Sequence, residues 1–121
     1  MGKKADLQKE ALKELMEYSD KLLLGIQNVV SELRENKKPD TDEMLNLVIQ
    51  GINWEIEVFN HTEELINKDM VNVDKSKMAA SVTRLGKVLQ EKDDIKIAAC
   101  LEVDFVPFVK AMEQTARTIC A

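Results

Sequence analysis

Apolar positions between residues 41 and 68 recur in two neighbouring series, each with the three- and four-residue steps of an α-helix. The first series consists of Leu45, Val48, Ile49, Ile52, Ile56, Phe59 and Ile66. The second consists of Met44, Leu47, Gly51, Trp54, Val58 and Leu65. Polar side chains fill only a narrow strip of the same helix. So wide an apolar arc must be covered on two sides, by helices of the same chain or by a second chain.

Three further segments show helical periodicity. The segment 4–35 has one apolar face formed by Leu12, Leu15, Met16, Ser19, Leu22, Leu23, Ile26, Val29, Val30 and Leu33. The segment 75–91 has a shorter face formed by Met78, Val82, Leu85 and Leu89. The segment 94–118 has a broad face formed by Ile95, Ala98, Leu101, Phe105, Phe108, Val109, Met112, Ala116 and Ile119. The sequence therefore predicts four helices, over residues 4–35, 41–68, 75–91 and 94–118.

Proline and aspartate mark the boundaries between these helices. Pro39 disfavours helical geometry in the residue before it, so the first helix should end there. Asp40 can then cap the second helix, with Glu43 completing a capping box. Asp74 and Asp93 are the expected caps of the third and fourth helices.

Pro107 falls inside the fourth helical segment. Its ring nitrogen cannot donate a hydrogen bond to the carbonyl of Val103, and the ring crowds that carbonyl. We expect either a kink of the helix near residues 103–107 or a break into two shorter helices. The kink is favoured because the apolar stripe keeps its phase across the proline.

Length and composition agree with a helical protein. The chain has 121 residues, which suffices for one domain, 1–121, with a single core and no need of metal or disulfide bonds. It contains only four glycines and two prolines. Four helices joined by short connections predict an all-α fold, an antiparallel up-down-up-down four-helix bundle.

The formal net charge of −5 is concentrated in the middle of the chain. Residues 41–70 carry seven acidic side chains and one basic side chain, whereas the flanking segments are close to neutral. Without a basic face, binding to nucleic acid or to an anionic membrane is not expected. No apolar run approaches the length of a membrane span, and the first residues lack the apolar stretch of a signal peptide. We expect a cytoplasmic protein.

The two cysteines agree with that location. Cys100 and Cys120 lie 20 positions apart on one expected helix, which places them about 30 Å from each other. An internal disulfide bond is therefore excluded. We expect two reduced thiols without a catalytic role.

The single histidine is the natural place to look for chemistry. His61 shares one helix face with Glu57 and Glu64, a spacing at which an imidazole and two carboxylates could hold a metal ion. Dinuclear carboxylate sites of ferritin-like bundles need a Glu-x-x-His motif on two helices, however, and this chain has one histidine. Histidine phosphotransfer modules are bundles of similar size, but the acidic neighbours of His61 would repel an incoming phosphate. We therefore expect no catalytic residues, no metal and no cofactor.

Three acidic residues stand at positions that the periodicity assigns to apolar faces. Glu55 and Glu63 fall within the apolar arc of the second helix, and Glu102 falls on the apolar side of the fourth. Each either lies at the edge of a seam with its carboxylate in water or is buried with a partner. Arg84 and Lys87 of the third helix are the expected partners in the second case.

Residues 93–107 contain a set of positions with characteristic spacing, namely Asp93, Ala98, Leu101, Glu102, Asp104 and Pro107. This stretch resembles the final-helix motif D-x4-A-D-x-L-E-Y-E-x-x-P of an uncharacterised family of small bacterial proteins. Ala99 and Val103 depart from the motif, which has Asp and Tyr there. Residues 51–55 also resemble the central helix of that family. The resemblance implies a bacterial four-helix bundle and implies no activity.

The leading functional hypothesis is a non-enzymatic protein–protein interaction module, such as a chaperone-like or regulatory helper. It would work by burying a helix face against a partner or a second copy, of which a homodimer is the simplest version. The candidate interaction surface consists of Leu24, Leu47, Trp54, Val58, Ile97, Val103 and Val106. The alternatives are a metal- or ligand-binding bundle around Trp54, Glu57 and His61, or a phosphotransfer-like module that uses His61.

Overall fold

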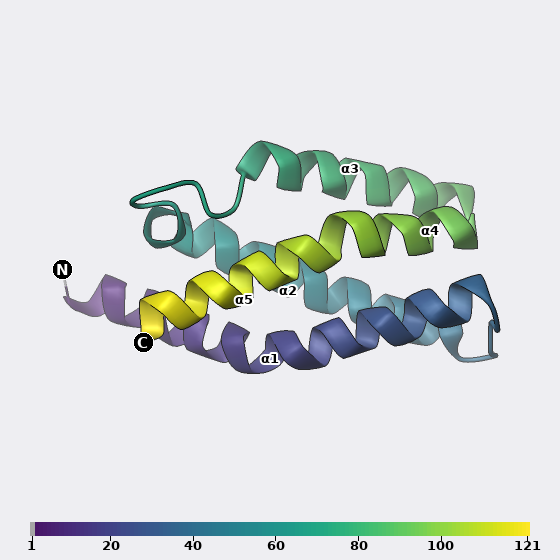
Figure 1. Cartoon of the computed structure of the whole chain (residues 1–121), viewed down its shortest axis with the longest axis horizontal. Coiled ribbons are helices and arrows are strands. Elements are labelled where there is room, and N and C mark those ends of the chain that lie inside the picture. The colour runs from purple at the N-terminus through teal and green to yellow at the C-terminus, as the bar shows by residue number, and fades with distance from the viewer. Residues whose placement is uncertain (1) are drawn as a thin grey trace.

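The computed structural model of the chain describes residues 2–121, and over these residues it is all-helical. The helices are α1 (Gly2–Arg34), α2 (Thr41–Ile66), α3 (Lys75–Glu91), α4 (Asp94–Cys100), the π-helical turn η1 (Leu101–Phe105) and α5 (Val106–Cys120). Because α4, η1 and α5 follow one another without a loop, they form one continuous fourth helix (Figure 1). The predicted number of helices is confirmed. Within residues 2–121, no helix combines the length and the apolar character needed to cross a membrane.

The core lies between α1, α2 and the continuous helix formed by α4, η1 and α5. In Figure 1, α1 lies along one side of α4 and α5, and α3 lies along the other. Helix α1 packs against α2, α4 and α5, whereas α3 packs against α4 and η1. The largest fully buried side chains come from these central helices, and they include Leu12, Leu15, Ile26, Ile52, Phe59, Leu101, Phe105 and Met112. Helix α3 is therefore the outermost of the four.

Two of the three predicted N-caps form as expected. The side chain of Asp74 accepts a hydrogen bond from the backbone N–H of Lys77, and that of Asp93 accepts one from the N–H of Lys96. Each bond satisfies one of the N–H groups that a helix leaves free in its first turn. The predicted bounds of α3, 75–91, are confirmed.

The N-terminus of α2 is built differently from the prediction. Asp40 occupies the cap position, but its side chain makes no capping hydrogen bond, so the predicted capping box with Glu43 is wrong. Instead, the hydroxyl of Thr41 holds the loop between α1 and α2 through two hydrogen bonds. Its Oγ1 accepts a bond of 2.8 Å from the N–H of Lys38 and donates one of 2.7 Å to Oε1 of Glu32. The helix begins where expected because Thr41 ties the loop back to α1.

The disturbance expected ahead of Pro107 takes the form of the π-helical turn η1. Here the N–H of Val106 bonds to the carbonyl of Leu101, five residues earlier, rather than to the carbonyl four residues earlier. Pro107 has no N–H to continue the α-helical ladder, and the wider turn lets the chain pass it. One extra residue is thereby inserted into the helix.

This inserted residue changes which side of α4 faces the core. A π-helical turn shifts the phase of the preceding helix by about one residue, or about 100°. As a result Ile97 is buried, only 3% exposed, whereas Ile95 points outward. Both expectations for these residues are wrong, since Ile95 was assigned to the core and Ile97 to the interaction surface. Ala98 and Leu101 of the expected stripe are buried as predicted, so the change ahead of the proline is the exchange of Ile95 for Ile97.

Candidate interaction surface

The outer apolar series of α2 is only partly covered by the rest of the chain. Leu47 is 63% exposed, and Met44 and Trp54 are half-buried. Val58 belongs to the hydrophobic core, so its assignment to an exposed interaction surface is wrong. Gly51 is also buried. The most exposed member of this series is therefore Leu47, with the half-buried Met44 and Trp54 on the same helix.

A groove follows the outer side of the seam between α1 and α2. It consists of two hollows of about 490 and 280 Å³, which share Tyr18 and Leu47. We call it the α1–α2 groove and define it by its lining residues Glu14, Tyr18, Lys21, Leu22, Gly25, Met44, Leu47, Val48, Gln50, Gly51 and Trp54. Its walls are mainly apolar, with polar side chains at the rim.

An aromatic pair forms the middle of the groove. The rings of Tyr18 and Trp54 meet edge to face, with centroids 5.5 Å apart and planes at 86°. Gly51 makes room for this pair, because a Cβ at that position would collide with the hydroxyl of Tyr18 and approach Cδ1 of Leu22 to 2.8 Å. Burial, and then the nearby carboxyl of Glu55, raise the pKa of Tyr18. The glycine thus lets α1 approach α2 closely.

The α2 side of the groove is acidic. Helix α2 contains six Asp and Glu residues and no Lys or Arg between Thr41 and Ile66, and among the six only Glu55 is buried. Glu14 lines the groove from α1, and Glu43 and Glu57 lie one turn before Leu47 and one turn after Trp54. Among residues 2–121, these three carboxylates form no ion pair. Lys21 is the one basic residue among those that line the groove.

On the inner side of the same seam, Glu55 is completely buried. Its Oε2 lies 2.9 Å from the Oγ of Ser19, and this Oγ lies 2.8 Å from the carbonyl oxygen of Leu15. A hydroxyl group has only one proton to donate. If Ser19 donates to Leu15, the carboxyl of Glu55 must be protonated and donate to Ser19. Ser19 can therefore form both hydrogen bonds at once only when the carboxyl of Glu55 is protonated.

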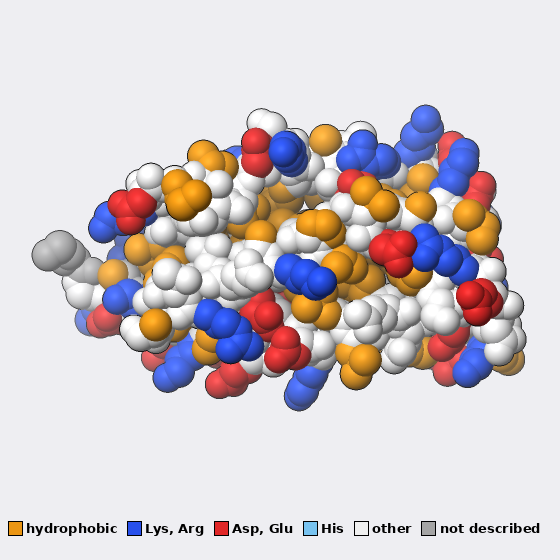
Figure 2. Space-filling view, in the orientation of Figure 1, with side chains coloured by type: hydrophobic (Ala, Val, Ile, Leu, Met, Phe, Trp, Pro, Cys, Tyr) orange, Lys and Arg blue, Asp and Glu red, His pale blue; other side chains and the backbone are white. Residues whose placement is uncertain are grey.

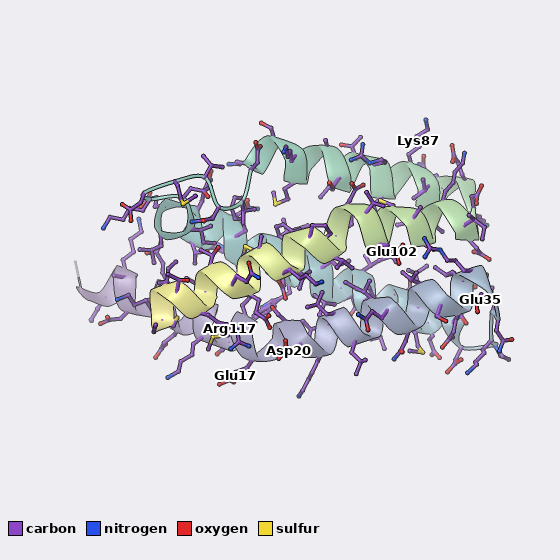
Figure 3. All side chains as sticks on the ribbon, viewed as in Figure 1. Glu17, Asp20, Glu35, Lys87, Glu102 and Arg117 are labelled. Carbon is purple, nitrogen blue, oxygen red and sulfur yellow. The ribbon has the colours of Figure 1, made fainter. Side chains whose placement is uncertain are left out.

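The electrostatics of this seam agree with that assignment. Burial raises the pKa of Glu55 to about 8; the bond with Ser19 opposes the shift and the charge of Glu113 adds to it. A hydrogen bond with Asp20 and then burial raise the pKa of Glu113, while Arg117 opposes them. The guanidinium of Arg117 on α5 lies 3.7 Å from Glu113 and 3.9 Å from Asp20 on α1 (Figure 3). Glu55 thus lies in a region that is already rich in carboxylates.

The expectation that Arg84 or Lys87 pairs with Glu55, Glu63 or Glu102 is wrong. Glu55 is bonded to Ser19, and Glu102 is paired with Arg34 at 3.0 Å. Glu63 is paired with Lys75 at 3.4 Å. Arg84 binds Asp104 instead, at 2.7 Å, and Lys87 lies on the outer side of α3, away from Glu102 (Figure 3).

The predicted interaction residues do not form one surface. Leu47 and Trp54 line the same groove. Leu24 is 59% exposed on α1 but is not among the residues that line it. Val103, 68% exposed, lines a hollow beside α3, and Val106 lines a shallower one between α1 and η1. The structure therefore brings together only two of the seven residues.

The hollow beside α3 was not anticipated from the sequence. It has a volume of about 330 Å³ and lies between α3 and the helix formed by η1 and α5, where Figure 2 shows hydrophobic side chains at its base. The Arg84–Asp104 ion pair forms one wall, and the thiol of Cys100 donates to Asp104 at 3.5 Å. Burial raises the pKa of Cys100 to about 11, so the thiol stays protonated and is a poor nucleophile.

His61 lies near the C-terminal end of α2. Its side chain is exposed, and its backbone carbonyl accepts a bond of 2.9 Å from the side-chain amide of Gln8. Within residues 2–121, no three His, Cys, Asp or Glu side chains lie close enough together to hold a metal ion. The metal alternative around Glu57 and His61 therefore has no ligand set in the described part of the chain.

A comparison with protein-family models identifies one family. The model described as a domain of unknown function (DUF8042) matches residues 10–115. The match covers most of the chain, including residues 93–107, and the chain belongs to this family. No curated protein and no solved structure matches the chain.

Proposed function

We propose that this member of the DUF8042 family is a non-enzymatic protein–protein interaction module, a chaperone-like or regulatory helper. It binds by burying the exposed outer side of α2 in an interface. In the same proposal the four helices form an antiparallel up-down-up-down bundle that acts in the bacterial cytoplasm. Its partners are proteins rather than nucleic acids or membranes, in keeping with the acidic charge of the chain.

The observation that supports this proposal is the exposure of Leu47 beside Trp54. Both side chains stand on a helix that is otherwise held in the core by Val48, Ile52 and Phe59. A rigid helix can present a large apolar side chain without paying to order it at the moment of binding. Aromatic side chains at the centre of a concave apolar surface are the residues that contribute most to protein interfaces.

A second copy of the chain is the simplest occupant of this surface, because most protein oligomers are symmetric homodimers. Sedimentation equilibrium compares the wild type with Leu47→Gln and with the matched control Leu24→Gln. Both substitutions replace an exposed leucine, Leu47 on α2 and Leu24 on α1, by a polar side chain of similar length. Self-association that Leu47→Gln abolishes and Leu24→Gln retains supports the homodimeric version.

A heterologous partner is tested with the same three proteins, immobilised and exposed to an extract of the native cell. Proteins that are retained by the wild type and by Leu24→Gln, but not by Leu47→Gln, support an interaction through this surface. The proposed function is refuted if neither self-association nor any captured protein depends on Leu47.

A further inference from the structure

We infer that the partner of the α1–α2 groove is a cationic amphipathic helix, with an apolar stripe flanked by Lys and Arg side chains. This inference rests on the proposed function, because it names the chemistry of the partner for the same surface. It follows from the shape of the groove, from its continuation along α1, and from the sign of the charges at its rim.

The shape of the groove suits an apolar side chain from a partner. Tyr18 of α1 lies over Gly51 and against the ring of Trp54, and the exposed Leu47 lines the same hollow. The larger hollow, of about 490 Å³, has room for more than one side chain of leucine size. Its polar lining is limited to Glu14 and Gln50, both at the rim.

Apolar positions continue along α1 beyond the groove, with Glu14 and Lys21 between them, and this spacing favours a helix as the occupant. On α1, Leu7, Ala11, Tyr18 and Gly25 recur at steps of four and seven and so share one side of the helix. Leu7 is exposed, and Tyr18 and Gly25 line the groove. From Leu7 to Gly25 the stripe extends about 27 Å at 1.5 Å per residue. An amphipathic helix of about five turns would cover this length with residues at i, i+3, i+4 and i+7.

The charge at the rim selects a basic partner. Among the lining residues, Glu14 and Lys21 carry opposite charges. The exposed Glu43 and Glu57 lie one turn beyond Leu47 and Trp54 on α2, which has no Lys or Arg between Thr41 and Ile66, so the excess charge on that side of the groove is negative. In a symmetric dimer through this groove, the same acidic rim would face itself, and like charges brought together oppose association. Lys and Arg side chains beside the apolar stripe of a partner would instead pair with these carboxylates. The second copy is therefore the less favourable occupant.

Fluorescence of the single Trp provides the test, because Trp54 lies in the groove. The probe is a synthetic 18-residue peptide of Leu and Lys with all Leu on one helical face. One control peptide replaces every Lys by Glu, and another keeps the Leu and Lys content in a scrambled order without an apolar face. None of them contains Trp, so a change in emission reports on Trp54 alone.

We expect the Leu–Lys peptide to change the emission of Trp54 to saturation, and neither control peptide to do so at the same concentrations. Leu47→Gln should weaken binding about tenfold, as expected when an apolar anchor is lost, and Leu24→Gln should leave it unchanged. The double variant Glu43→Gln, Glu57→Gln should weaken binding and flatten its dependence on salt concentration.

Each other outcome overturns a defined part of this interpretation. Equal binding by Leu47→Gln and Leu24→Gln, or no binding of the Leu–Lys peptide at all, overturns the inference. Binding of the Leu–Glu peptide as tightly as the Leu–Lys peptide, with dependence on Leu47, overturns the cationic partner and leaves the proposed function standing. A dimer of the wild type that Leu47→Gln dissociates has the same consequence, because it identifies a second copy as the occupant.

Discussion

The two sides of the seam between α1 and α2 are the reverse of what hydrophobicity alone would suggest. On the inner side a carboxyl group, that of Glu55, is 0% exposed, while on the outer side Leu47 is 63% exposed. Both residues belong to the same helix and lie two turns apart. At these two positions, the placement of the neighbouring helices and not the polarity of the side chain determines which residue is buried.

Each of these residues is tolerated for a different physical reason. Glu55 is compatible with the core because its carboxyl shares a hydrogen bond with the Oγ of Ser19 and its raised pKa lets it remain neutral. Its Oε1 still has no hydrogen-bond partner among the described side chains. Leu47 is exposed at little cost to folding, since exposed leucines are common on protein surfaces. It is a candidate for binding because it lines the α1–α2 groove together with Trp54.

Truncation of a side chain in the core and of one on the outer side of α2 should give the largest difference in the free energy of unfolding. Phe59→Ala removes a fully buried ring from the core and should lower the free energy of unfolding by about 3–5 kcal/mol. Leu47→Ala removes an exposed side chain and should change it by less than about 0.5 kcal/mol. Urea denaturation of both variants measures the difference. A loss for Leu47→Ala close to that for Phe59→Ala would mean that Leu47 is covered in solution.

The second largest effect should be a pH dependence of stability that originates from the buried Glu55. The ordinary pKa of Glu55, 4.5, applies to the unfolded chain, whereas burial raises it to about 8 in the folded chain. Between these values the folded chain holds a proton that the unfolded chain has lost. Stability should therefore fall as the pH rises from about 5 to 8 and level off above the folded pKa. From pH 6 to pH 8 we expect a loss of about 2 kcal/mol.

Glu55→Gln is the control for this effect. Its amide N–H can donate to the Oγ of Ser19 as the neutral carboxyl does, but it does not titrate. Urea denaturation at several pH values should show a clearly flatter profile for Glu55→Gln than for the wild type. The profile should keep a small slope, since the pKa of Glu113 is also raised. Identical slopes in the two proteins would show that Glu55 is ionised in the fold.

The number and bounds of the helices could be predicted because they depend on local signals. The apolar periodicity and the capping aspartates Asp74 and Asp93 act within a few residues of where they stand. The phase of α4 could not be predicted, because the π-helical turn at η1 inserts a residue whose effect is seen only in three dimensions. Ile95 and Ile97 exchanged places for this reason.

The groove could be predicted only in part. The second apolar series of α2 pointed to Leu47 and Trp54, which do line it. The sequence offered no signal that Tyr18 of α1 would stand against Trp54, because such a pairing depends on the register of the two helices. The partner of Glu55 was missed for the same reason. Ser19 was expected on the apolar face of its helix, but only the packed seam shows which acid it meets.

The smallest predicted effects are those of two glycine substitutions, one in the crowded seam between α1 and α2 and one on the open surface of α3. Gly51→Ala places a methyl group against Tyr18 and Leu22. This clash should outweigh the better helix propensity of alanine and destabilise the fold by about 1 kcal/mol. It should also change the emission of Trp54, because Tyr18 must move. Gly86→Ala in α3 meets no heavy atom within 4 Å and should stabilise the fold by about 0.5–1 kcal/mol. The midpoint of thermal unfolding should therefore fall for Gly51→Ala and rise for Gly86→Ala. A rise for both variants would show that the seam can relax to admit a side chain.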